Sequence, residues 1–254
     1  MLVDTHSHIY SEEFNDDIDQ VITRAYDCDV RKIILPNIDS SSIKKMLDLA
    51  DQYPQICYPL MGLHPTSVGE DYQEELELVE YWLKKRKFYG IGEIGIDLYW
   101  ERTFIDQQIQ AFRHQLQLAK KYQLPVVLHV RESFDEVFEV VKDENTPELT
   151  GVFHSFTGSV EQAEKIIDLG FKIGIGGIVT FKNSGLDEVV RQIHPRHLIL
   201  ETDSPYLTPV PFRGKRNESS YLIHIARRIA GIHDLSVNEV ARITSINAVN
   251  LFGI

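Results

Sequence analysis

Eight short apolar stretches alternate with helical patterns along this chain, and that alternation limits the possible fold more than any other feature. We expect the stretches to be strands, at Leu2–Ile9, Lys32–Ile38, Cys57–His64, Tyr89–Ile96, Pro125–Val130, Gly151–Phe156, Lys172–Phe181 and His197–Asp203. Short runs that are mostly apolar are typical of parallel strands covered on both faces. Strands that alternate with helices predict an α/β fold with a parallel sheet.

The segments between these stretches have helical periodicity and helical end signals. One helical face carries the apolar residues Ile105, Ile109, Phe112, Leu116 and Ala119. An open doubly wound sheet shows the same alternation, but the count of eight favours a closed (β/α)₈ TIM barrel. The length of 254 residues suits one such barrel. We therefore expect a single TIM-barrel domain over residues 1–254.

The charge balance excludes a broad basic surface for nucleic acid. The formal net charge is −12, so an anionic substrate must be attracted by local charge, for which bound metal cations are one source. Cys28 and Cys57 are too far apart in sequence for metal-ligand spacing and make no disulfide framework. With no signal peptide and no apolar run long enough to span a membrane, we expect a cytoplasmic protein, without a membrane or an obligate protein partner, and a monomer.

Polar residues of metal-ligand type lie at the ends of five expected strands. Two histidines separated by one residue end the first strand, where both side chains would point to the same side. The full set is His6, His8, Glu93, His129, His154 and Asp203. In a barrel the carboxyl ends of the strands hold the active site. Packing alone gives no reason for five such ends to converge, so the pattern predicts a metal centre.

Six ligands exceed what one zinc ion takes from protein, and they suit two divalent ions that share a carboxylate. Glu93 is the expected bridge, because it lies in an otherwise apolar run where an unpaired charge is costly. His6, His8 and Asp203 would complete one site, and His129 and His154 the other. A histidine-rich donor set suits zinc or another transition metal.

Other candidates have weaker support. His64 precedes a proline and would either contact substrate or simply end its strand, while Arg213 opens a basic run that would be either solvated surface or a phosphate clamp. Glu201 shares the strand face of Asp203 and is expected to support a ligand rather than to be one. The G-x-G-x-x-G pattern at residues 90–95 lies inside an expected strand, so we do not interpret it as a dinucleotide site.

These motifs resemble the TatD family of metal-dependent deoxyribonucleases, within the amidohydrolase-like barrels, over essentially the whole chain. The resemblance is carried by residues 4–8, 62–65, 92–97, 128–131, 154–156, 201–207 and 213–218. It implies that the six residues named above are metal ligands and that magnesium, manganese or zinc is the cofactor. Ser219 replaces the family's usual proline, which leaves the local loop shape open.

The resemblance implies a barrel of the metal-dependent hydrolase type that cleaves phosphodiester bonds from DNA ends. As a hypothesis for the mechanism, metal-bound hydroxide attacks, Asp203 orients the water and accepts its proton, and Arg213 and His64 hold the phosphate. Two alternatives stay open from the residues themselves. One is a metal-dependent hydrolase of an amide, lactone or ester, because the same ions polarise a carbonyl. The other is a metal-bound binding protein without catalysis.

Overall fold

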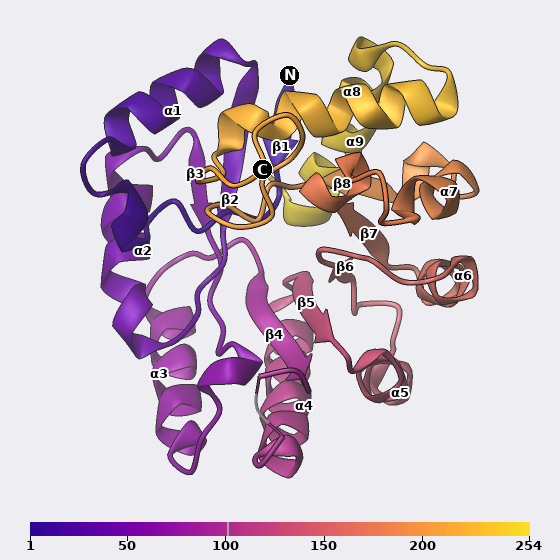
Figure 1. Cartoon of the computed structure of the whole chain (residues 1–254). Helices are drawn as coiled ribbons and strands as arrows, with labels where there is room; N and C mark the ends of the chain where they lie inside the picture. Colours follow the sequence, from indigo (N-terminus) through magenta and orange to yellow (C-terminus); the bar gives the residue numbers. More distant parts are fainter. Residues whose placement is uncertain (101) are drawn as a thin grey trace.

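The computed structural model describes residues 1–100 and 102–254, and it places parallel strands at the centre with helices around them (Figure 1). The strands in this part of the chain are β1 (Leu2–Asp4), β2 (Val30–Leu35), β3 (Cys57–Pro59), β4 (Ile91–Asp97), β5 (Val126–Arg131), β6 (Gly151–Phe153), β7 (Lys172–Ile175) and β8 (Leu198–Leu200). The helices are α1 (Ile18–Asp27), α2 (Ser40–Gln52), α3 (Tyr72–Lys85), α4 (Ile105–Tyr122), α5 (Phe134–Glu144), α6 (Val160–Asp168), α7 (Leu186–Arg191), α8 (Leu222–His233) and α9 (Val237–Phe252). Short 3₁₀ helices lie at η1 (Glu12–Phe14), η2 (Pro65–Ser67), η3 (Gly177–Thr180), η4 (Pro195–His197) and η5 (Ser219–Tyr221).

The strands close into a barrel. Ladders join β1-β2-β3 and β4-β5-β6-β7-β8, with every pair parallel. Isolated parallel bridges between Ser7 and Ser204 and between Met61 and Ile91 connect the two ladders at both seams. The expected (β/α)₈ barrel is therefore confirmed, and the doubly wound alternative is excluded.

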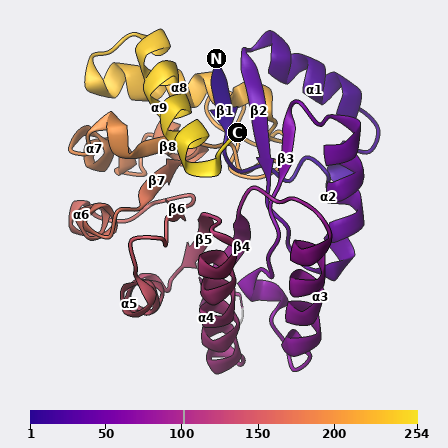
Figure 2. The same cartoon turned by 180° about the vertical axis from the view of Figure 1, so that it is seen from behind.

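The barrel interior is apolar at the end where the strands begin. Val3, Val127 and Ile199 come from three different strands and pack with Ala248 and Phe252 of α9. Figure 2, the view from behind, shows α9 lying across this end of the strands. Its Ser245 and Asn247 side chains donate hydrogen bonds to the carbonyls of Met1 and Leu198, at 3.1 and 2.7 Å. This helix closes the floor of the barrel, so the open end is the one where the strands finish.

All eight strand locations are correct, but most of the expected strands are too long at their carboxyl ends. The first was expected to reach Ile9 and ends at Asp4, and the eighth was expected to reach Asp203 and ends at Leu200. His6 and His8 therefore do not lie on a strand. The prediction that strand geometry points both side chains to the same side was wrong for this reason. The chain leaves the ladder earlier because the residues that follow make hydrogen bonds across the barrel mouth instead.

Two further observations concern the membrane and the cysteines. Among the described residues, no helix has both the length and the apolar character needed to cross a bilayer. Cys28 and Cys57 are free thiols, with Cys57 buried and Cys28 half-buried. Burial raises the pKa of Cys57 to about 12, so this thiol stays protonated and packs as an apolar group.

Candidate active site

The segments that follow β1 and β8 are joined by hydrogen bonds. The buried Asp4 carboxylate accepts bonds from the backbone N–H and the hydroxyl of Thr202, at 2.9 and 2.7 Å. The Asp203 N–H donates to the carbonyl of His6 at 2.9 Å, and the His8 N–H donates to that of Ser204 at 2.7 Å. Asp203 has a left-handed backbone with φ of 58°, unusual for a residue with a side chain and frequent where function requires a fixed geometry. These bonds bring His6, His8 and Asp203 together.

A glycine allows β4 to approach β5 closely beside the site. Gly95 has φ of 143°, and a Cβ atom there would lie 2.2 Å from the carbonyl oxygen of His129. Any side chain at this position would separate the two strands. Gly95 therefore lets His129 lie next to Glu93, which is two residues earlier on β4.

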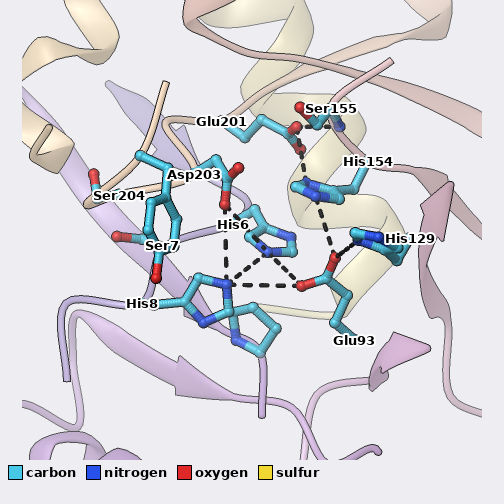
Figure 3. A network of polar contacts seen from close by, with 12 residues as sticks. His6, Ser7, His8, Glu93, His129, His154, Ser155, Glu201, Asp203 and Ser204 are labelled. Atoms are coloured by element: carbon cyan, nitrogen blue, oxygen red, sulfur yellow. Dashed lines mark hydrogen bonds and ion pairs between the residues drawn. The ribbon is translucent and has the colours of Figure 1, made fainter. Parts of the chain in front are cut away.

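Glu93 lies at the centre of the cluster, and its two oxygens face different histidines (Figure 3). Oε2 lies 3.1 Å from Nε2 of His6 and 3.7 Å from Nε2 of His8. Oε1 lies 2.7 Å from Nδ1 of His129 and 3.3 Å from Nε2 of His154. Each carboxylate oxygen thus faces two imidazoles, and the rings of His6 and His154 also stack on each other, with their centres 3.7 Å apart.

The outer nitrogens of His8 and His129 have partners that determine which nitrogen carries the proton. The Tyr10 hydroxyl donates its hydrogen to the carbonyl of Pro36, so the 2.7 Å contact between Tyr10 and Nδ1 of His8 requires a proton on Nδ1. In His129, Nε2 lies 2.8 Å from a carboxylate oxygen of Asp97 and donates to it. In the neutral tautomers, Nε2 of His8 and Nδ1 of His129 therefore present lone pairs to the interior of the site.

His154 has a carboxylate close to its outer nitrogen, since an oxygen of Glu201 lies 3.1 Å from Nδ1 of His154. Lone pairs that face Glu93 and one another at such distances repel unless positive charge lies between them. The pKa of His154 also reflects the negative charge around it. Burial lowers its pKa, but the charges of Glu201 and Glu93 outweigh burial and raise it to about 10. For Glu93, burial raises the pKa, and the surrounding imidazoles outweigh this and hold it well below its usual range.

These residues fit metal cations by the chemistry of their donors. Three sets have ligand atoms within 4.8 Å of one another. The sets are His6 with His8 and Asp203, His6 with Glu93 and His154, and His64 with Glu93 and His129. Nitrogen and oxygen donors held by outer hydrogen bonds are typical of metal centres in proteins.

The cluster opens into a cavity of about 820 Å³ at the carboxyl ends of the strands. Its lining includes Glu93, His129, His154 and Asp203, as well as Trp100. Burial raises the pKa of Asp203 to about 6. A carboxylate of this pKa, open to a cavity, can accept a proton near neutral pH.

The two expected substrate contacts lie in different places. His64 lines the cavity, with Nε2 3.5 Å from Oε1 of Glu93 and 3.2 Å from Nδ1 of His129. Arg213 is exposed on the loop after β8, where its guanidinium lies 4.0 Å from the centre of the Phe181 ring, and it is not among the residues that line the cavity.

Asp97, Tyr10 and Arg131 all lie at the site, although none of them was given a role from the sequence. Asp97 and Tyr10 hold the outer nitrogens of His129 and His8, and Arg131 places its guanidinium at the cavity. Asp97 lies on the same strand as Glu93, and this could have indicated its role. Tyr10 carries no such signal, because only the folded chain brings its hydroxyl to both His8 and Pro36.

Comparison with known proteins agrees with this site. The family model described as TatD related DNase matches residues 3–253. The uncharacterized metal-dependent hydrolase YabD of Bacillus subtilis is 38% identical over 255 residues that cover 100% of both chains. The crystal structure of the TatD homologue YjjV of Escherichia coli has a TM-score of 0.94 at 32% identity, and the match covers 100% of this chain and 98% of that one.

A more distant member has the same architecture. The TatD family hydrolase of Entamoeba histolytica has a TM-score of 0.86 at 25% identity, with 99% of this chain and 97% of that chain covered. The resemblance stated from the motifs is thereby confirmed. The chain belongs to the TatD related DNase family and is a metal-dependent hydrolase.

Proposed function

We propose that this protein hydrolyses phosphodiester bonds at DNA ends with two divalent cations. The observation that carries the proposal is the central position of Glu93, whose two oxygens face different histidines. Such an arrangement suits a carboxylate that bridges two ions. The family's deoxyribonuclease activity makes a phosphodiester the first substrate to test.

We assign the donor atoms to the two ions in the way that the sequence predicts. His6, His8 and Asp203 would hold one ion, His129 and His154 the other, and Glu93 both. When bound, the ions would polarise the attacking water and a phosphoryl oxygen. Magnesium, manganese and zinc are the candidate metals.

Asp203 is the proposed proton acceptor. The water oxygen forms a bond to phosphorus, the bond from phosphorus to the leaving oxygen breaks, and the water proton goes to the Asp203 carboxylate. The leaving oxygen takes a proton from solvent. The position of Asp203 in the cavity lining supports this role, because the carboxylate can reach a water there.

The proposal also includes two phosphate contacts and three predictions about the whole chain. His64 is proposed to contact the phosphate from inside the cavity, or to join His129 as a donor. Arg213 remains a proposed phosphate contact for a strand that extends beyond the cavity towards the loop after β8. We also keep the predictions of one domain over residues 1–254, a monomer and a cytoplasmic location.

Glu93→Ala tests the proposal, because it removes both bridging oxygens. We expect loss of cleavage of a single-stranded oligonucleotide by roughly 100-fold or more, together with loss of bound metal measured by elemental analysis. Glu144→Gln is the matched control, since Glu144 is a half-buried carboxylate that pairs with Lys120 and is not a cavity-lining residue.

Two outcomes contradict the proposal. A Glu93→Ala protein that keeps full activity or both metals excludes the bridging role. Wild-type protein that, with Mg²⁺, Mn²⁺ or Zn²⁺, cleaves an ester or a lactone but no phosphodiester supports the alternative substrate class instead.

A further inference from the structure

Two large aromatic side chains are exposed directly after β4. Tyr99 and Trp100 are 52% and 67% exposed, and Trp100 lines the cavity of the site. Exposing an indole to water forgoes the apolar burial that such a ring provides. Their position at the mouth of the cavity points to a ligand that covers them.

The turn that carries these rings is held by a residue that also contacts the metal-ligand cluster. One oxygen of Asp97 accepts the backbone N–H groups of Tyr99 and Trp100, at 2.9 and 2.8 Å. The other oxygen accepts Nε2 of His129 at 2.8 Å. The position of the aromatic turn relative to the cluster is therefore fixed by one buried carboxylate.

Arg131, at the end of β5, adds a cation to the same place. Its guanidinium lies 4.2 Å from the ring centre of Tyr99 and 5.4 Å from that of Trp100, and it lines the cavity. Within residues 1–100 and 102–254, no carboxylate makes an ion pair with this guanidinium, whereas its neighbour Glu132 pairs with Arg102. Among these described residues, the contacts of the Arg131 guanidinium are with the two aromatic rings, and a guanidinium is well suited to bind a phosphate.

A third exposed aromatic ring lies on the other side of the mouth. Tyr206 follows β8, lines the cavity and is 57% exposed. In the closed order of strands, three strands separate β4 from β8 in either direction, so these two strand ends lie opposite each other. Trp100 and Tyr206 thus line the same cavity from segments that follow opposite strands.

We propose that Trp100, supported by Tyr99 and Arg131, is a stacking platform for an unpaired nucleobase next to the scissile phosphate, with Tyr206 on the opposite side of the same strand. This inference rests on the proposed phosphodiester hydrolysis and specifies single-stranded nucleic acid as its substrate. Aromatic rings bind any base through its flat face, and a guanidinium beside them binds the adjoining phosphate. In a duplex these faces are already stacked, so paired ends would bind less well.

The test compares two single-stranded oligonucleotides of equal length in the presence of Mn²⁺. One carries ordinary bases, and the other carries stable abasic residues at its three terminal positions at both ends. For the wild type we expect kcat/KM about tenfold higher or more on the strand with bases. Trp100→Ala should bring this ratio close to one, mainly through a higher KM, while Trp100→Phe keeps most of it.

Tyr26→Ala is the matched control. Tyr26 is 54% exposed, and the Arg31 guanidinium lies 3.8 Å from its ring centre, but it is not a cavity-lining residue. The ratio for this variant should equal that of the wild type. The platform is refuted if Trp100→Ala keeps the wild-type ratio while the wild type cleaves DNA.

A binding measurement separates failure of the platform from failure of the proposed function. The sequence contains two tryptophans, so in a Trp82→Phe variant Trp100 is the remaining one. We expect dAMP to quench its fluorescence more strongly than deoxyribose 5-phosphate does, whether or not the protein cleaves DNA. Equal quenching by the two compounds excludes base stacking, and absence of wild-type cleavage of either strand counts against the nuclease proposal alone.

Discussion

At the scale of single residues, the site depends on partners that bind no metal themselves. The Glu201 carboxylate lies 3.1 Å from Nδ1 of His154 and accepts the backbone N–H of Ser155. Space for it is provided by Gly174, where a Cβ atom would lie 2.5 Å from its Oε2. The negative charge of Glu201 therefore favours a proton on Nδ1 of His154.

Glu201→Gln should weaken metal binding without removing a proposed ligand. The amide keeps the size of the side chain but loses the negative charge that favours a proton on Nδ1 of His154. We expect the metal affinity to fall by about 10- to 100-fold, measured by calorimetric titration of the metal-free protein with Zn²⁺. An affinity equal to that of the wild type would show that this ring needs no outer carboxylate.

The sequence allowed the candidate ligands to be chosen but not their outer partners. His6, Glu93 and Asp203 are identifiable because a buried charge or imidazole at a strand end needs a reason. The role of Tyr10 depends on a carbonyl 26 residues away, at Pro36, and no local pattern encodes that contact. Arg213 was chosen because it lies in a basic run of the sequence, but such a run does not indicate whether a side chain lines the cavity, and Arg213 is not among the lining residues.

At the scale of elements, alternation predicted the strands and their order, whereas strand length was set by tertiary contacts. β1, β3, β6 and β8 have three residues each, although longer apolar runs surround them. Where β1 ends, the backbone stops pairing with β2 as a strand and makes hydrogen bonds to the segment after β8. Helix α6 has typical end signals, since Ser159 caps its start with a capping box and Gly170, with φ of 84°, follows its end.

Helix α9 makes an element-scale prediction possible. Phe252 is 4% exposed and packs in the apolar cluster that forms the barrel floor. Phe252→Ala should lower the free energy of unfolding by about 3–5 kcal/mol, because it leaves a cavity among strands that cannot all move inwards. Urea unfolding followed by circular dichroism measures this value.

Ile246→Ala on the same helix is the control, since Ile246 is 46% exposed and its loss should cost within about 0.5 kcal/mol. If the two variants unfolded at the same urea concentration, the floor would contribute nothing to the stability of the barrel.

At the scale of the whole molecule, the net negative charge repels an anion, whereas Arg131 and the proposed cations at the cavity attract one. The formal net charge is −12, and part of the basic loop after β8 is engaged, because Arg216 pairs with Asp17 at 2.8 Å. Arg131, which lines the cavity, and the proposed cations are the charges that lie closest to a strand end bound there. This favours recognition of a strand end over binding along a duplex.

The salt dependence of cleavage measures how many such contacts there are. Each phosphate contact on a single strand contributes about −0.7 to the slope of log affinity against log salt. With Arg131 in the cavity lining and Arg213 nearby on the β8 loop, we expect a slope for kcat/KM between zero and about −2 at constant Mn²⁺. A steeper slope, near −5, would require a broad basic surface that the charge distribution of this chain does not provide, and it would mean that DNA binds somewhere other than the barrel mouth.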